Sequence, residues 1–379
     1  MPAALLIFAT LVIILYSGCM LWYYISFKRY HELPLHNAKP LFRVVSVILP
    51  IRNEEANLRM LVHDLLVQDY GTGNCEIIFV DDHSTDRSFT MLGQVCREHT
   101  HFRLIRLQDG MTGKKHAIAA GIEAASGEWI IQTDADCRLP ANFISGHVQY
   151  ARAGADLVAG PVIVRTGKSV WGSMESLEHF GLTATSMAAA AAGRPVMCSG
   201  ASLSYSKKFY LEVAPGLFAI PHASGDDVFL LAAAKKRKKN ILFPTVPGMV
   251  VTTGPAEGPV AFLRQRIRWG SKARYYRDAD MLLLALLVWF ANVTLTGLLA
   301  ASLFVNGVVW LFFPALALKS FSEYLLLNKV AARLRLRHLM VLFPAAALFY
   351  YFYITFAGML SMLGSFSWKG RRYSSQGCL

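Results

Sequence analysis

The sequence is poor in charged residues and has no regular cysteine pattern. Only 17% of its 379 residues are charged, whereas 54% are hydrophobic, and this composition excludes an intrinsically disordered chain. The six cysteines include no Cys-x-x-Cys pair. Neither a disulfide framework nor a zinc site is therefore indicated.

A glycine-rich dinucleotide motif is missing as well. Gly71-Thr72-Gly73 lies before a predicted strand and not after one, so a dinucleotide-dependent dehydrogenase is not expected. Gly113-Lys114-Lys115 opens a predicted helix, where lysines and free backbone N–H groups would meet a diphosphate. The alternative is that these lysines are simply solvated. We expect no nucleic acid as a partner.

Three long stretches contain no charged residue, at 3–25, 281–318 and 339–364. A bilayer core of about 30 Å needs roughly 20 apolar helical residues. The first and third stretches are therefore long enough for one span each, and the second for a hairpin. The first stretch lacks the basic start and the cleavage site of a signal peptide. We predict a multi-pass membrane protein with a retained N-terminal anchor.

Basic residues lie beside these stretches. Lys28 and Arg29 follow the first, and six Lys or Arg residues between 264 and 277 precede the second. By the positive-inside rule, the chain between them is expected on the cytoplasmic side of the inner membrane. The predicted segments are an anchor at 1–27, a cytoplasmic domain at 28–257, an interfacial helix at 258–280, a transmembrane hairpin at 281–318, an amphipathic interfacial helix at 319–338, a transmembrane or re-entrant segment at 339–364 and a basic tail at 365–379.

The last apolar stretch presents a conflict. Four crossings would leave the C-terminus outside, whereas Lys369 and Arg371 favour a cytoplasmic tail. Pro344 and Gly358 would permit a bend, and nonhelical backbone is tolerable in the membrane when it packs against protein. We therefore predict that the stretch 339–364 enters the membrane and returns.

Strand and helix patterns alternate in the cytoplasmic part. Four β-branched, apolar runs of strand length are separated by three helical patterns. This order predicts an α/β fold with a doubly wound sheet, whose ligand lies at the carboxyl ends of the strands. The strand patterns are at 43–50, 75–80, 102–107 and 129–133, and the helical patterns are at 54–68, 85–97 and 114–125.

Acidic residues follow three of these strands: Glu54, Asp81 with Asp82, and Asp134 with Asp136. Carboxylates that share one edge repel one another unless a cation joins them. Mg²⁺ or Mn²⁺ bound by one or two carboxylates and substrate phosphates would explain the Asp-x-Asp spacing. The alternative is that Asp134 and Asp136 only shape a turn.

Two further motifs come later in the chain. Asp226 and Asp227 precede an apolar helical pattern, where they would face a cleft or merely cap the helix. Gln265, Arg268 and Trp269 lie in a basic aromatic segment before the second apolar stretch. The alternative for this segment is a helix that rests on lipid headgroups.

Taken together, the motifs resemble those of the family 2 glycosyltransferases, which are inverting enzymes with the GT-A fold. The resemblance extends from about Val45 to Arg277 and includes membrane-embedded members, similar to ceramide glucosyltransferases and polysaccharide synthases. Arg52 and Gly225 depart from the usual pattern. The ordered motifs are Pro50-x-x-Asn53-Glu54, Val80-Asp81-Asp82-x-Ser84-x-Asp86, Asp134-x-Asp136, Asp226-Asp227 and Gln265-x-x-Arg268-Trp269.

The resemblance implies a role for each motif, with Mg²⁺ or Mn²⁺ as cofactor. It implies that Glu54, Asp81 and Asp82 hold the nucleoside of a nucleotide-sugar donor. Lys114, from its place at the start of a predicted helix, is expected to contact the diphosphate of that donor. Asp134 and Asp136 would hold the metal. It also implies that Asp227, or else Asp226, is the general base, while Gln265, Arg268 and Trp269 contact the donor diphosphate and the sugar or acceptor ring.

The acceptor is open between two classes. We favour transfer of one sugar from a UDP-sugar to a membrane lipid, because at most four spans are too few for a polysaccharide pore. The alternative is a processive polysaccharide synthase that needs a partner subunit. A second alternative is a non-catalytic nucleotide-sugar-binding scaffold, which would be expected to have lost part of the acidic set.

Overall fold

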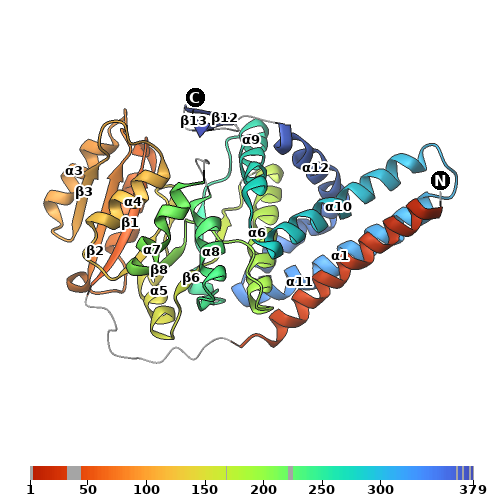
Figure 1. Ribbon diagram of the computed structural model, residues 1–379, viewed down its shortest axis with the longest axis horizontal. Coiled ribbons are helices and arrows are strands. Elements are labelled where there is room, and N and C mark those ends of the chain that lie inside the picture. The colour runs from red at the N-terminus through yellow and green to blue at the C-terminus, as the bar shows by residue number, and fades with distance from the viewer. Residues whose placement is uncertain are drawn as a thin grey trace. The chain divides into compact units, whose positions relative to one another are not determined.

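The computed structural model describes residues 3–31, 44–167, 169–220 and 225–363, and three short strands near the C-terminus. Its contacts divide the chain into two compact units (Figure 1). The sheet unit contains residues 31–165, 197–254 and 368–379, and the helical unit contains residues 1–30, 166–196 and 255–367. The segment 166–196, which the sequence predicted within the domain at 28–257, makes its contacts within the helical unit.

The sheet unit is built on a seven-stranded mixed sheet with the order β3-β2-β1-β4-β8-β6-β9. The first four strands of this order pair in parallel, whereas β8 runs antiparallel to both β4 and β6. The predicted α/β fold with a doubly wound, mixed sheet is confirmed. The strands are β1 (Val45–Ile51), β2 (Cys75–Asp81), β3 (Phe102–Arg106), β4 (Trp129–Gln132), β6 (Leu157–Ala159), β8 (Leu203–Ser206) and β9 (Ile241–Leu242).

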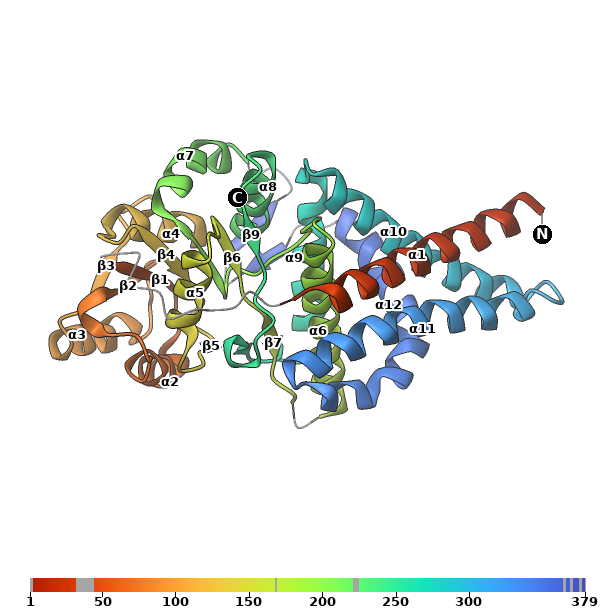
Figure 2. The same ribbon diagram turned by 90° about the horizontal axis from the view of Figure 1, so that it is seen from below.

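Helices cover both faces of the sheet, which explains why its central strands are apolar throughout. Helices α2 (Glu55–Leu66), α3 (Ser88–Glu98) and α5 (Phe143–Arg152) share one hydrophobic core with alternate residues of β1. Helix α4 (Lys114–Ala124) packs on the opposite face, where Gly121 lies against Ile48 and Val80 (Figure 2). The helices place their first residues beside the carboxyl ends of the strands.

A second, three-stranded sheet adjoins the Asp-x-Asp loop. Its order is β5-β10-β7, with β10 antiparallel to β5 and parallel to β7. The remaining elements of the sheet unit are β5 (Cys137–Arg138), β7 (Val162–Val164), β10 (Val251–Thr253), α7 (Lys207–Phe218), α8 (Asp226–Lys236), η1 (Thr72–Asn74) and η2 (Pro247–Met249). Three C-terminal strands, β11 (Phe366–Trp368), β12 (Arg371–Ser374) and β13 (Gly377–Cys378), form a sheet of their own.

The helical unit contains six long helices, and by length and composition four segments of it are apolar enough to cross a membrane. These segments are Ala4–Arg29, Ala279–Ser302, Val309–Leu334 and Arg337–Ser361. The elements are α1 (Ala3–Arg29), α6 (Val170–Ala191), α9 (Pro259–Gly270), η3 (Ser271–Tyr275), α10 (Ala279–Ser302), α11 (Val309–Leu334), η4 (Arg337–Leu342) and α12 (Phe343–Leu363). The prediction of a membrane protein is in agreement with these helices.

The segment 319–338, predicted as an amphipathic interfacial helix, does not begin a helix of its own. Residues up to Leu334 continue the helix that starts at Val309. The charge that suggested a boundary is satisfied inside the bundle, because Lys319 Nζ lies 2.7 Å from Glu323 Oε1 and the Tyr16 hydroxyl donates to the same oxygen at 2.5 Å. A buried, paired lysine does not end an apolar helix.

Phe343, at the start of helix α12, and Gly358, five residues before its end, contact α11 and α10 at similar distances from the turn that joins those two helices. Phe343 contacts Tyr324, which lies 15 residues after the start of α11, and Gly358 contacts Trp289, 13 residues before the end of α10. At 1.5 Å per residue these positions are about 22 and 20 Å from the turn that joins the two helices. Figure 2 shows α12 between α10 and α11, which diverge from that turn.

The course of α12 bears on the predicted re-entrant segment. Phe343 and Gly358 contact residues away from the turn at 303–308, whereas Tyr351, midway between them, contacts Phe312 beside it, and the re-entrant course stays a prediction. Pro344 and Gly358, which would permit a bend, both lie within one continuous helix from Phe343 to Leu363. The side of the membrane on which the tail lies stays a prediction.

Candidate active site

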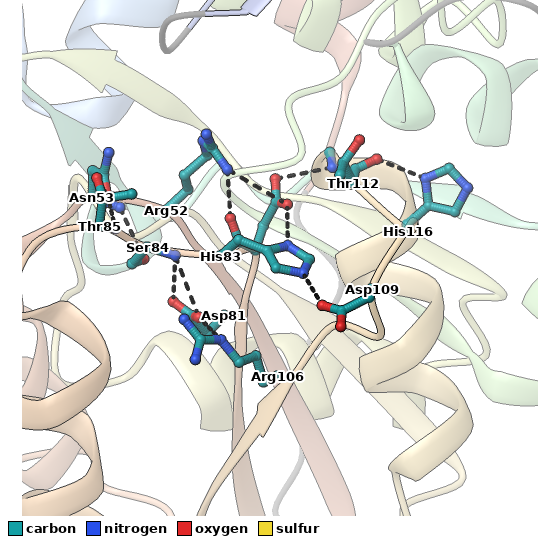
Figure 3. Close-up of polar contacts among 12 residues, drawn as sticks. Arg52, Asn53, Asp81, His83, Ser84, Thr85, Arg106, Asp109, Thr112 and His116 are labelled. Carbon is teal, nitrogen blue, oxygen red and sulfur yellow. Dashed lines mark hydrogen bonds and ion pairs between the residues drawn. The ribbon is translucent and has the colours of Figure 1, made fainter.

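Two acidic residues are buried where β2 ends (Figure 3). Asp81 accepts a hydrogen bond from the Ser84 N–H at 3.2 Å, and Arg106 Nε lies 3.2 Å from its second oxygen. Asp82 Oδ2 accepts from the Gly113 N–H at 2.9 Å, at the start of α4. The structure thus fixes both predicted nucleoside-binding carboxylates through neighbouring loops.

Arg52, which the sequence showed only as a departure from the family pattern, is part of this cluster. Its guanidinium donates to the Asp82 carbonyl oxygen at 2.6 Å and lies 3.7 Å from Asp82 Oδ1. His83 Nδ1 lies 3.4 Å from the same carboxylate oxygen. Figure 3 shows these side chains around the end of β2. A cation at position 52 would favour a negatively charged ligand beside Asp82.

The loops after β1 and β2 are joined by hydrogen bonds. The Asn53 N–H donates to Ser84 Oγ at 3.1 Å, and Asn53 Oδ1 accepts from the Thr85 N–H at 2.8 Å. Glu54 is buried, and its Oε2 accepts from Asn57 Nδ2 at 2.8 Å while its N–H donates to Ser88. The third predicted nucleoside-binding acid therefore sits at the start of α2, held by its own helix.

Lys114 lies close to the carboxylates of Asp134, Asp226 and Asp227. Its Nζ lies 2.5 Å from Asp134 Oδ1. Burial alone would lower the pKa of Lys114, but the nearby charges of Asp134, Asp226 and Asp227 outweigh it and raise the pKa above its usual value. These carboxylates favour the charged form of Lys114, and its ion pair with Asp134 is more than the solvated lysine of the alternative interpretation.

The acid pair at the start of α8 lies against Gly200. The Gly200 N–H donates to Asp227 Oδ2 at 3.1 Å, and Gln132 Nε2 donates to Asp226 Oδ2 at 3.2 Å. A Cβ atom at position 200 would stand 2.7 Å from Gln132 Nε2 and 3.2 Å from Lys114 Nζ. Any side chain at position 200 would displace the Gln132 amide and the Lys114 ammonium, so the Gly200 backbone is part of the site.

Asp136 is the exposed acid of the Asp-x-Asp motif. Thr253 Oγ1 donates to its Oδ2 at 3.3 Å, and the Cys137 thiol lies 3.6 Å from its Oδ1. Within the described ranges, no group of three His, Cys, Asp or Glu side chains is arranged to hold a metal ion. Mg²⁺ and Mn²⁺ need fewer protein ligands than that when substrate phosphates complete their shell. The exposed carboxylate of Asp136 fits such an ion.

The motif before the second apolar stretch lies on α9, in the helical unit. Arg266 is buried there, donates from Nε to Glu178 Oε2 at 2.8 Å and has its guanidinium 4.3 Å from the Trp269 ring centre. It also donates to Gln265 Oε1 at 2.5 Å. Burial raises the pKa of Glu178, and the Arg266 charge opposes that shift. Arg268 is half-buried.

The predicted site residues fall into two groups. The structure brings Asp81, Asp82, Lys114, Asp134, Asp136 and the Asp226–Asp227 pair together in the sheet unit, with Glu54 behind them. Gln265, Arg268 and Trp269 belong to the helical unit, and their approach to the first group stays a prediction. Sequence patterns missed Arg266 and Glu178, because their partnership joins residues 88 positions apart.

Comparison with known proteins gives two family matches. Residues 46–210 match the family described as "Glycosyl transferase family 2", and residues 129–363 match the "Glycosyl transferase family group 2". Undecaprenyl-phosphate 4-deoxy-4-formamido-L-arabinose transferases are similar to part of the chain. The protein of Pectobacterium carotovorum is 36% identical over 115 residues, 30% of this chain and 35% of the relative. That of Pseudomonas aeruginosa is 33% identical over 129 residues, 34% and 38% of the two chains.

The chain thus spans only about a third of the length of these curated relatives. Among solved structures, the mannosyltransferase PcManGT from Pyrobaculum calidifontis, in complex with GDP-Man and Mn²⁺, is similar with a TM-score of 0.61. The likeness covers 91% of this chain and 99% of that one at 20% sequence identity, and it shows the fold alone. Because the match at residues 129–363 covers more than half of the sequence, the protein belongs to the glycosyltransferases of family group 2.

Proposed function

We propose that this glycosyltransferase moves one sugar, with inversion, from a nucleotide-diphosphate donor to a lipid acceptor at the inner leaflet of the cell membrane. A UDP-sugar is the donor that we expect. The observation that carries the proposal is the gathering of Asp82, Lys114, Asp134 and the Asp226–Asp227 pair at the carboxyl ends of the central strands. In open α/β sheets, ligands bind at this edge.

The donor would bind with its nucleoside beside Asp81 and Asp82. Their oxygens are already fixed by Ser84 and Gly113, so they offer preformed hydrogen-bond acceptors to ribose and base. Lys114 would then meet the diphosphate, since its charge is maintained by Asp134. Glu54 supports this side of the site through the start of α2.

Asp136, together with Asp134, would hold Mg²⁺ or Mn²⁺. Such an ion, when bound, supplies positive charge to the leaving diphosphate. Arg268 would add a planar fork of donors for the same phosphates, and Gln265 would contact the donor beside it. Trp269 offers an apolar floor to a sugar or acceptor ring.

Inversion needs one displacement at the anomeric carbon and one general base for the acceptor hydroxyl. We assign this role to Asp227. The Gly200 N–H orients its carboxylate by a hydrogen bond at 3.1 Å. Asp226 instead accepts a hydrogen bond from the Gln132 amide. No enzyme nucleophile is required, because the acceptor oxygen attacks directly.

A lipid acceptor is supported by the helices and by the relatives. Four segments are apolar enough to cross the membrane, and the names of the relatives refer to undecaprenyl phosphate. The alternative, a processive polysaccharide synthase, would need a partner subunit to complete a pore. A non-catalytic scaffold is disfavoured because the acidic set and Lys114 stand together.

The proposal is tested by incubating the purified protein with UDP- and GDP-sugars and membrane lipid extract, followed by mass spectrometry of the products. A lipid that gains one sugar supports it, whereas a ladder of polymer masses supports the synthase. EDTA should abolish turnover and Mg²⁺ or Mn²⁺ restore it, with Asp136→Asn as the variant that loses this response. Full activity in excess EDTA would contradict the metal assignment.

A further inference from the structure

The loop that carries Asp134 and Asp136 has little secondary structure to hold it. It leaves β4 after Gln132 and enters β5, which is only two residues long. Thr133 anchors its start through a hydrogen bond to the Ala201 carbonyl oxygen at 2.8 Å. Its far end is joined to β10 by a two-residue antiparallel pairing, which is short compared with ordinary strands.

A buried carboxylate on α2 accepts hydrogen bonds from the segment at the end of this loop. Asp64 is 4% exposed, and its two oxygens accept from Arg138 Nε at 2.6 Å and Nη2 at 2.8 Å. The Leu139 N–H donates to the same carboxylate at 3.0 Å. Two-pronged arginine–carboxylate pairs fix orientation as well as distance. Arg138 lies two residues after Asp136, so this attachment is transmitted to the loop through one short piece of backbone.

The residues that follow Leu139 are also hydrogen-bonded to the segment after α2. Gln68 Nε2 donates to the Pro140 carbonyl oxygen at 2.9 Å, and Gln68 Oε1 accepts from the Ile144 N–H at 3.0 Å. The Asp69 N–H donates to the Ala141 carbonyl oxygen at 2.9 Å. Asp64, Gln68 and Asp69 therefore clamp the whole segment that leads from the Asp-x-Asp motif into α5.

We propose that Asp64 and Arg138 are positioning residues that hold Asp136 where a divalent metal and the donor diphosphate meet. The inference rests on the metal role given to Asp136 under the proposed function. Mg²⁺ requires ligand distances near 2.0–2.1 Å and nearly octahedral geometry, so a carboxylate on a loosely held loop would bind it poorly. Neither residue touches the ion, and both act through the backbone of the loop.

The test is a Mn²⁺ titration of the full-length protein, with free Mn²⁺ measured by electron paramagnetic resonance in the presence of UDP and, separately, GDP. Residues that orient metal ligands typically contribute about 10- to 100-fold to metal affinity. We expect Asp64→Asn to weaken Mn²⁺ binding by about 10-fold. Arg138→Lys should do the same, because an ammonium keeps the charge but not the planar fork.

Glu76→Gln is the matched control. Glu76 is also a buried carboxylate on an arginine, 3.0 Å from Arg103 Nη1, but it lies at the opposite edge of the sheet, at the start of β2. The Glu76→Gln protein should be less stable than the wild type but should bind Mn²⁺ with the same affinity. Equal Mn²⁺ affinity in the wild type and in Asp64→Asn, or equal weakening in Glu76→Gln, would overturn the positioning role.

The outcomes separate this inference from the proposed function. If the wild-type protein binds no Mn²⁺ with either nucleotide, the metal assignment fails and the positioning role fails with it. If the wild type binds and the variants bind equally well, only the positioning role fails. Should Asp64→Asn not fold, Arg138→Lys decides the question, because Arg138 is partly exposed and tolerates a lysine of similar length.

Discussion

Asp226 and Asp227 are neighbours in the sequence that contact different groups. Asp227 accepts from the Gly200 backbone, whereas Asp226 accepts from the Gln132 side chain, which itself accepts from the Tyr205 hydroxyl at 3.0 Å. A chain of buried side chains thus holds Asp226 in a fixed place. Asp227 instead accepts from the backbone N–H of Gly200, where a side chain would displace Gln132 and Lys114. This difference favours Asp227 as the group that exchanges a proton with the acceptor.

The corresponding prediction concerns the rate of transfer. A positioned general base typically contributes about 10²- to 10⁴-fold, so Asp227→Asn should lower kcat by that order while the KM for the donor changes little. Steady-state kinetics with the identified donor measure both constants. Asp226→Asn is the matched comparison, and a dead Asp226→Asn beside an active Asp227→Asn would reverse the assignment.

At the scale of elements, α6 and α9 are joined by a buried ion pair. Arg266 donates to Glu178 and stacks on both Phe262 and Trp269, at 4.3 Å from each ring centre. His179, one residue after Glu178, contacts the Trp269 ring as well. The side chains at 265 and 269 are therefore set by this pair, although neither belongs to it.

We predict that Glu178→Gln destabilises the protein by about 3–5 kcal/mol, because it leaves the Arg266 charge buried without a partner. The double variant Glu178→Leu/Arg266→Met should regain most of the Tm, since two apolar side chains replace two buried charges. The kcat of the double variant should nevertheless be lower than that of the wild type, because Gln265 and Trp269 lose their contacts with Arg266. Recovery of both Tm and kcat would show that the pair serves stability alone.

The sheet has its own buried carboxylate at the edge away from the candidate site. Glu76 accepts from the Ser46 hydroxyl and the Ser126 N–H, both at 2.5 Å, and from Arg103 at 3.0 Å. Burial alone would raise the pKa of Glu76, but these hydrogen bonds outweigh it and hold the pKa below the usual value of 4.5. The strands β1, β2 and the turn before β4 are tied together by one charged group.

This arrangement predicts a pH-dependent stability. Because the folded-state pKa lies below the unfolded one, the contribution of Glu76 is fully present above about pH 4.5 and is lost as the pH falls through the folded-state pKa. Glu76→Gln should cost about 2 kcal/mol at pH 7. Thermal unfolding of both proteins at several pH values measures this, and a Tm difference that does not shrink in acid would contradict it.

For the molecule as a whole, local patterns predicted the elements and missed the long-range pairs. The apolar runs of β2 and β4 and the acids beside them are contiguous in the sequence, so the sheet edge and the places of Asp81, Asp82 and Asp134 at it could be predicted. Arg138 and Asp64 are 74 residues apart, and no periodicity links them. Lys319 is a similar case, because the Tyr16 ring that its ammonium contacts lies on another helix, far away in the sequence.

The contacts of α12 bear on the membrane topology, which stays a prediction. Phe343, at the start of α12, contacts α11 about 22 Å from the turn at 303–308, and Gly358, near its end, contacts α10 about 20 Å from that turn. A helix that crossed the bilayer beside these two would instead have one end near the turn and the other far from it. Three crossings would then be made by α1, α10 and α11, and the tail would stay on the side where α10 begins. That side also follows the positive-inside rule for the basic residues before α10.

We therefore predict that the C-terminus is cytoplasmic, and Cys378 provides the test. In a variant that keeps it as the sole cysteine, a membrane-impermeant maleimide should label the protein only after the cells are permeabilised. Phe304→Cys in a cysteine-free background is the control, because residue 304 is highly exposed in the turn between α10 and α11 and should be labelled on intact cells. Labelling of Cys378 on intact cells at the rate of the Phe304→Cys control would place the tail outside, and α12 would then have to cross the membrane.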